Sequence, residues 1–167
     1  MARPRLRQPL AWVAVAALAL LLLASGCGSA DGETSEDAAP TKRQFLREAH
    51  SVCYRFSKKQ VRRAEAFIES HGLDPAEPDQ REREQLIAAV VIPAAEEKLE
   101  GLRELQPPRG DEEKVETLLR AIEKGIRDAK ARPEWLAAPT PAHEQPFEHG
   151  MELWLEYGDW LCGQAGG

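Results

Sequence analysis

Residues 41–72 read TKRQFLREAHSVCYRFSKKQVRRAEAFIESHG. Apolar side chains recur at spacings of three and four here, which is typical of one buried helix face: Phe45, Ala49, Val52, Cys53, Phe56, Ala64 and Phe67. Thr41 and Gln44 match a capping box, in which two side chains satisfy the first unpaired amides of a helix. Gly72 can adopt the left-handed conformation that ends a helix. The stretch therefore predicts a helix from residue 42 to His71.

A second amphipathic segment begins near Asp79 and extends to Leu105. Pro93 lies inside it and should kink it, because proline removes one backbone hydrogen bond and crowds the preceding turn. Pro107 and Pro108 then end the segment. We expect one long, bent helix over residues 79–105.

Two more helices follow. Asp111 can cap a third helix that ends before Pro133, and Pro146 can open a fourth that reaches Cys162. No segment alternates with the period of a strand. We therefore expect an all-α domain over residues 41–163, an antiparallel four-helix bundle, followed by a short tail over 164–167.

The first 26 residues have the order of an export signal. Arg3, Arg5 and Arg7 precede an apolar run from Leu10 to Ala24, after which small residues follow. The run has 15 residues, fewer than the roughly 20 that a helix needs to cross a bilayer. We expect residues 1–26 to be a signal peptide that is removed.

The sequence Leu23-Ala24-Ser25-Gly26-Cys27 resembles the lipobox of bacterial lipoprotein precursors. Ala24 stands where that family most often has leucine. The resemblance implies that Cys27 receives a diacylglycerol, whose two chains give a stable membrane anchor. The alternative is a chance cysteine beside an ordinary cleavage site. Residues 28–40, GSADGETSEDAAP, are too polar to fold, so 27–40 is expected to be a lipidated cysteine with a flexible acidic linker.

The chain has three cysteines, and lipidation of Cys27 leaves two. In an oxidising compartment Cys53 and Cys162 are expected to form a disulfide between the first and last helices. The lengths of the two helices agree with this pairing. The 18 residues from Cys53 to His71 span about 27 Å of helix, and the 16 residues from Pro146 to Cys162 span about 24 Å. If the two helices are antiparallel with these ends level, the two cysteines meet. The alternative is that one of the two is a reactive thiol.

The expected mature chain is acidic. Without residues 1–26 it has 28 acidic and 19 basic residues, a net charge of −9. Nucleic-acid binding depends on cationic surface, so the charge disfavours nucleic acid as a partner.

Three features of the mature part occur together: a cysteine between Phe45 and Phe56, a Leu102-x-x-Leu105-x-Pro107-Pro108 helix stop, and a final helix with Tyr157-Gly158-x-x-x-Cys162-Gly163. Residues 41–163 thereby resemble small secreted or lipid-anchored helical proteins of high-GC Gram-positive bacteria. The resemblance implies fold, disulfide and location. It implies no activity, substrate or ligand.

The first helix carries a basic sector, defined as Arg55, Lys58, Lys59 and Arg62. These side chains could contact anionic lipid or an acidic partner. The alternative is ion pairing with acidic residues of the second helix: Glu82, Glu84, Glu96 and Glu97. Arg63 projects onto the apolar face itself, so it pairs internally, extends out at the helix end, or faces an anionic ligand.

Aromatic residues gather in the last third of the chain. Trp154 is expected in the core, whereas Trp135 and Trp160 are candidates for an exposed interaction surface.

No metal site, cofactor site or catalytic motif is expected. His149, Glu152 and Glu156 share one helix face, but they offer only one strong nitrogen ligand, so a solvated face is the simpler interpretation. The favoured function is a membrane-anchored, extracytoplasmic binding module for an envelope protein or wall component. The alternative is a small-molecule or metal carrier with a site between the helices near Pro93; an enzyme is least favoured.

Overall fold

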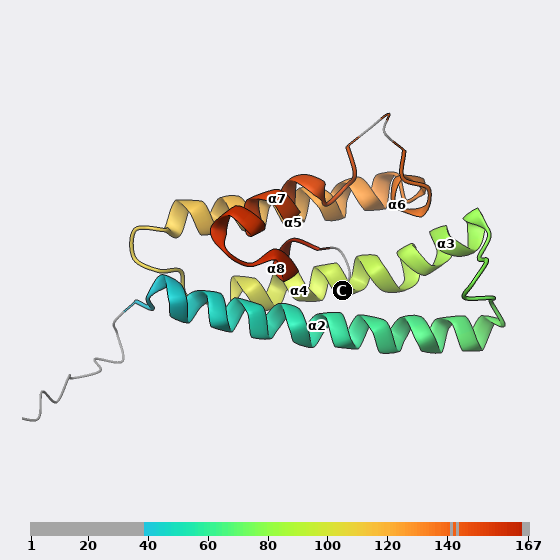
Figure 1. Cartoon of the computed structure of the whole chain (residues 1–167), viewed down its shortest axis with the longest axis horizontal. Helices are drawn as coiled ribbons and strands as arrows, with labels where there is room; N and C mark the ends of the chain where they lie inside the picture. Colours follow the sequence, from blue (N-terminus) through green and yellow to red (C-terminus); the bar gives the residue numbers. More distant parts are fainter. Residues whose placement is uncertain (1–38, 141, 143, 165–167) are drawn as a thin grey trace, which may run out of the picture. The chain divides into compact units, whose positions relative to one another are not determined.

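The computed structural model describes residues 39–140, 142 and 144–164, and every regular element within them is helical (Figure 1). The predicted signal peptide and Cys27 lie outside the described residues, as does nearly all of the predicted linker. Residues Ala39–Gly167 form one compact unit. No helix in the described ranges is long and apolar enough to cross a membrane.

Helix α2 spans Lys42–His71, as the sequence predicts. The capping box is formed, since the Thr41 hydroxyl accepts from the Gln44 amide and the Gln44 side chain accepts from the Thr41 amide. Gly72 ends the helix with a φ of 63°. Full burial is confined to the first half of the predicted apolar face, at Phe45, Ala49, Val52 and Cys53.

The expected second helix is divided into three parts: α3 (Gln80–Leu86), a π-helical turn (Ile87–Val91) and α4 (Ile92–Arg103). The chain is thus helical throughout residues 80–103, and the irregular turn lies directly before Pro93, where the sequence predicts a kink. Pro93 has no amide hydrogen and its ring crowds the preceding turn, and the wider π-helical turn directly before α4 accommodates both.

Helix α5 spans Glu112–Ala131 and has Asp111 at its N-cap position. Asp111 makes no capping bond, contrary to expectation; its carboxylate instead accepts a 2.9 Å hydrogen bond from the Tyr157 hydroxyl. One helical turn, α6 (Glu134–Ala137), lies between the predicted third and fourth helices, where the sequence predicts no helix.

The expected fourth helix is broken. Helix α7 spans Glu148–Tyr157, and a single turn, α8, spans Trp160–Gly163. Gly158 separates them with a φ of 121°, a conformation that side-chain-bearing residues rarely adopt. The Asp159 carboxylate then accepts from the amides of Leu161 and Cys162, which starts α8.

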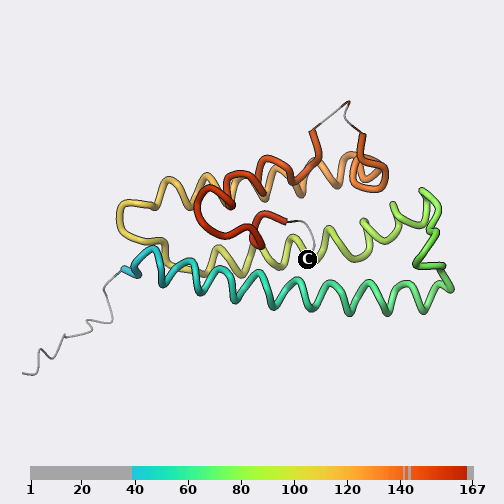
Figure 2. Tube along the Cα trace, viewed as in Figure 1, coloured from blue at the N-terminus to red at the C-terminus, as the bar shows by residue number. Residues whose placement is uncertain are grey.

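The helices pack in a chain of neighbours. Helix α4 lies between α2 and α5, α7 packs on α5, and α8 packs against α7 and α2 (Figures 1 and 2). The largest fully buried side chains, which mark the core between these layers, are Trp154, Phe45, Leu102, Ile122, Cys53 and Cys162.

The predicted disulfide is confirmed. Cys53 in α2 and Cys162 in α8 are bonded, and their Cα atoms are 5.3 Å apart. The length argument behind the prediction is wrong, because it assumed one continuous final helix lying along α2. Helix α7 packs mainly on α5, and the break at Gly158 brings Cys162 across to α2.

Candidate functional site

A groove of about 770 Å³ lies where α8 meets the first turns of α2. We call it the Trp160 groove; its lining residues are Lys42, Arg43, Leu46, Arg47, His50, Gly158, Asp159 and Trp160. Three of the eight are lysine or arginine side chains from α2, and the one acidic side chain is Asp159. The groove is therefore a cationic surface bordered by an aromatic ring.

Local structure sets the position of the ring. The positive φ of Gly158 turns the chain away from α7, and Trp160 is the first residue of α8. Its side chain is 55% exposed, whereas Trp154 in α7 is fully buried. The exposure of Trp160 and the burial of Trp154 agree with the prediction from the sequence. An exposed indole beside cations can stack on a planar group or enter a lipid headgroup layer.

The acid of the groove is already engaged. Asp159 is 5% exposed, and its second carboxylate oxygen lies 3.1 Å from Nδ1 of the exposed His50. Asp159 thus links the cap of α8 to the outer face of α2, and it offers little free negative charge to a ligand.

A buried lysine lies on the inner side of α8, behind the groove. Lys98 in α4 is 5% exposed, and its ammonium donates to the carbonyl oxygens of Cys162 and Gln164 at the end of α8. Burial lowers the pKa of Lys98 to about 8, and the nearby charge of Asp159 opposes that shift. Lys98 therefore supports α8 from inside while His50 contacts Asp159 from outside.

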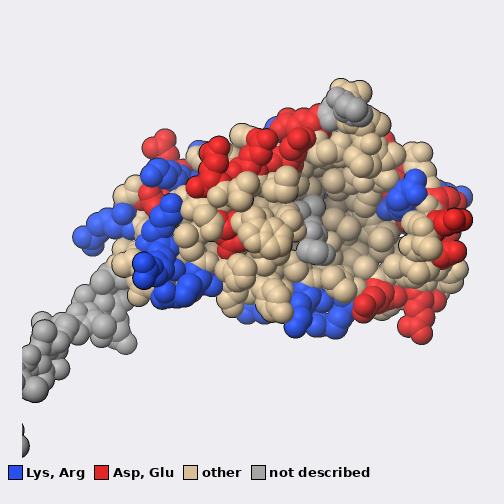
Figure 3. All heavy atoms as spheres, in the orientation of Figure 1, with Lys and Arg blue, Asp and Glu red and all other residues tan. Residues whose placement is uncertain are grey.

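The cations of the groove form part of a larger asymmetry. In the view of Figure 3, Lys and Arg atoms gather over the end of the domain where α2 begins, Asp and Glu atoms lie along the upper edge, and atoms of both signs lie at the opposite end. The chain has a net charge of −6, so this basic end is a local reversal of the overall sign.

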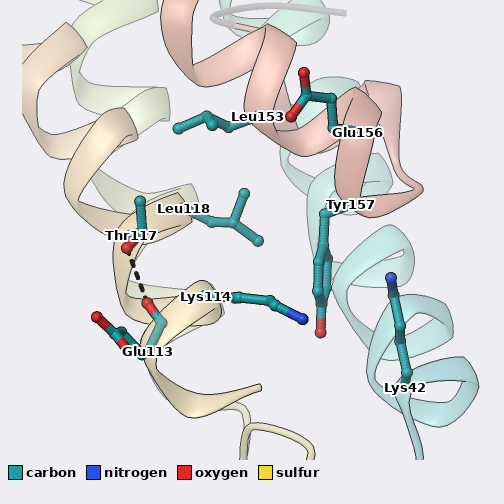
Figure 4. Close-up of a pocket in the computed structure, with 8 residues that line it drawn as sticks. All are labelled: Lys42, Glu113, Lys114, Thr117, Leu118, Leu153, Glu156 and Tyr157. Carbon is teal, nitrogen blue, oxygen red and sulfur yellow. Dashed lines mark hydrogen bonds between the residues drawn. The ribbon is translucent and has the colours of Figure 1, made fainter. Parts of the chain in front are cut away.

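A second groove, of about 440 Å³, shares Lys42 with the first. Figure 4 shows the Tyr157 ring between Lys42 on one side and Lys114 on the other. The Lys42 ammonium lies 4.1 Å from the ring centroid, and Lys114 pairs with Asp111 at 3.0 Å. Burial and the bond to Asp111 raise the pKa of Tyr157, while Lys114 and Tyr157 lower the pKa of Asp111. The lining of this groove balances two lysines, Lys42 and Lys114, with two glutamates, Glu113 and Glu156, so it lacks the excess of positive charge found in the Trp160 groove.

The predicted basic sector is divided in the structure. Lys59 pairs with Glu97 at 2.5 Å, which is the ion pairing that the sequence offered as the alternative. Arg63 pairs with the same carboxylate at 2.8 Å, the first of its three expected roles. Both contacts lower the pKa of Glu97.

The other members of the sector remain on the outer face of α2. Arg55 lies over the Phe56 ring at 5.4 Å, and Lys58 over the Tyr54 ring at 5.0 Å. Arg62 is exposed. None of the four sector residues lines the Trp160 groove.

Trp135 does not join Trp160. It lies partly buried in α6, with the Arg132 guanidinium 3.9 Å from its ring centroid, and it does not line the Trp160 groove. The expected interaction surface of two tryptophans and the basic sector is therefore not brought together in that groove.

The residues that sequence reasoning missed are Arg43, Arg47 and His50. They recur at spacings of four and three on the exposed side of α2, so their common face was available from the helix prediction alone. Their meeting with Trp160 was not, because it depends on the contact between α8 and α2.

The face of α7 that carries His149, Glu152 and Glu156, considered above as a possible metal site, is exposed. His149 lies 4.0 Å from Glu152, while Glu156 lines the second groove. Within the described ranges no three His, Cys, Asp or Glu residues cluster in a way that could hold a metal ion.

Comparison of this chain with protein-family models, with curated proteins and with solved structures finds no match. The function has to be argued from the residues and geometry of this chain.

Proposed function

We propose that the chain is a lipoprotein precursor whose mature helical domain is tethered through Cys27 at the extracytoplasmic face of the membrane, as a binding module. In this proposal residues 1–26 are removed and Cys27 carries the diacylglycerol. The Cys53–Cys162 disulfide supports export, because such bonds persist in oxidising compartments. We further propose that the domain is an antiparallel four-helix bundle with a bent second and a broken fourth helix.

The observation that carries the binding role is the Trp160 groove. Lys42, Arg43 and Arg47 supply positive charge around an exposed indole, and Asp159 is occupied by His50 and by the cap of α8. The lining residues include no serine, threonine or cysteine that could act as a nucleophile. The groove is thus suited to holding an anionic group by charge and stacking. The carrier alternative has less support, since Pro93 lines neither groove.

Anchoring is tested with the full chain expressed in a bacterium that processes lipoproteins. Mass spectrometry of the membrane-extracted protein should give an N-terminal peptide that begins at Cys27 and carries the diacylglyceryl mass. Cys27→Ser should release the protein or leave the precursor uncut. Normal processing and membrane retention of Cys27→Ser would contradict the proposal.

Binding is tested in the same cells by placing a photoreactive phenylalanine derivative at position 160. The matched control carries the derivative at Leu155, an exposed position in α7 that lines neither groove. Irradiation should give an adduct from position 160 alone, and Arg47→Glu should weaken it. Equal adducts from both positions would show that contact at Trp160 is not selective.

A further inference from the structure

The exposed face of α2 carries a continuous stripe that extends beyond the Trp160 groove. At 100° per residue its five members fall within about 80° of the helix circumference and extend over about 22 Å. We call it the α2 stripe; its members, all exposed, are Arg43, Arg47, His50, Tyr54 and Lys58.

The stripe combines cations with aromatic rings. Tyr54 is 51% exposed, and its ring stacks with that of His50 and lies under the Lys58 ammonium at 5.0 Å. Trp160 adds an exposed indole beside Arg43 and Arg47. Lysine and arginine beside exposed tyrosine and tryptophan form the composition that associates with a bilayer interface, where cations meet phosphates and rings lie at headgroup depth.

We infer that the α2 stripe and the Trp160 groove bind the anionic phospholipid surface of the membrane, with α2 lying along the bilayer. This inference rests on the proposed function, since the anchor is what holds the domain at a membrane. It names the anionic ligand of the groove as the phosphate-bearing headgroup of that lipid.

The attachment point of the chain supports this occupant. The folded unit begins next to Thr41, so the linker from Cys27 joins α2 at the end that carries Lys42, Arg43 and Arg47. Fourteen residues reach at most about 50 Å even when fully extended. A lipid on Cys27 therefore holds this end of the domain within about 50 Å of the headgroups, and no part of the fold is closer to the anchor along the chain.

Charge selects the orientation. The domain over residues 41–167 has 24 acidic and 19 basic residues, a net charge of −5, so an anionic surface repels the domain as a whole and attracts only its basic end. Lys59 is paired with Glu97, whereas Arg43 and Arg47 have no acidic partner within salt-bridge distance in the described structure. Their charge is available to lipid phosphates.

The test uses chain 27–167 with Cys27→Ser, so that no acyl group contributes, and co-sedimentation with vesicles. All the core residues described lie between Phe45 and Cys162, and circular dichroism checks each variant for folding. The vesicles are phosphatidylcholine alone, or phosphatidylcholine containing about one third phosphatidylglycerol. We expect binding to the second kind only. It should weaken when salt rises from about 0.01 to 0.15 M, as the screening length falls from about 30 to 8 Å.

Arg43→Glu with Arg47→Glu should lower the partition coefficient at least tenfold. The matched control is Arg120→Glu with Lys124→Glu, which makes the same charge change on the exposed face of α5 and should bind as the parent does. Brominated lipid should quench the tryptophan fluorescence of the parent more strongly than that of Trp160→Phe, because the tryptophans that remain are the buried Trp154 and the partly buried Trp135, which does not line the groove.

Absence of binding to phosphatidylglycerol vesicles, equal binding to both kinds of vesicle, or equal loss in the α5 control would overturn the inference. None of these results bears on anchoring through Cys27 or on the photoadduct from position 160. If the protein does not bind the vesicles but position 160 alone gives a photoadduct with a protein, the groove would be assigned to an acidic protein instead.

Discussion

The ammonium of Lys98 donates a hydrogen bond to the carbonyl oxygen of Cys162 at 3.2 Å, within the part of the domain that the disulfide closes. A cation in α4 thus holds the last turn of the chain, 64 residues further on.

Lys98 predicts a rise in stability at alkaline pH. Its pKa is about 8 in the folded protein and about 10.4 in an unfolded chain, so between these values the unfolded state binds more protons. The free energy of unfolding should rise with pH from about 8 to 10, by at most about 1.4 kcal/mol per pH unit. Urea unfolding at pH 7, 8, 9 and 9.5 measures this.

Lys98→Met should abolish the rise, whereas Lys124→Met, at an exposed lysine, should keep it. Measurements stop below pH 10 because the raised pKa of Tyr157 has the opposite effect: unfolded tyrosine ionises there first, and stability falls. A flat profile in the parent protein would show that the Lys98 amine is not desolvated.

Reduction of Cys53–Cys162 should lower the free energy of unfolding by about 2–5 kcal/mol, since the bond joins residues 109 positions apart. Helix α8 is a single turn and cannot sustain itself, so its amides should lose protection from hydrogen exchange before those of α5. Unchanged exchange at residues 160–163 after reduction would refute this order.

Gly158→Ala should destabilise the domain by about 2–3 kcal/mol, because a φ of 121° is strained for any residue with a side chain. The added Cβ would also lie 3.3 Å from Leu46. Gly72→Ala is the matched control, with a φ of 63° and no atom within 4 Å of the new Cβ, and should cost about 1 kcal/mol. Thermal unfolding compares the two; equal losses would mean that the α7–α8 turn carries no special constraint.

Neighbouring lysines in α2 should respond differently to charge reversal. Lys59→Glu places a like charge against Glu97 and should cost about 1 kcal/mol, whereas Lys58→Glu should change stability by less than about 0.5 kcal/mol. Chemical unfolding of the two variants at low salt gives the comparison. A larger loss at Lys58 would mean that its contact with Tyr54 is worth more than the ion pair.

Helix α2 could be predicted to its ends because its signals are local: a capping box at Thr41, a repeating apolar face and Gly72. The break in the last helix was missed although Gly158-Asp159 contains both a stop and a cap, since the apolar spacing continues through it to Leu161. At that point the glycine turn and the Asp159 cap decide where the helix ends, and the apolar periodicity does not.

The disulfide followed from counting cysteines, but the route by which Cys162 reaches Cys53 did not, because it depends on the turn at Gly158. Trp160 was predictable as an exposed residue, and the shared face of Arg43 and Arg47 could have been found from their helical spacing. Their meeting with Trp160 could not be predicted, because it arises from the packing of α8 on α2, a tertiary contact without a local signal.

The disulfide also determines what a protease could do to the domain. The loops over residues 73–79 and 104–111 both lie inside the ring that Cys53 and Cys162 close. One cut in either loop yields two fragments, one holding Cys53 and the other Cys162, that stay covalently joined. A nicked domain would therefore remain whole on a non-reducing gel, with its C-terminal half still attached to its N-terminal half.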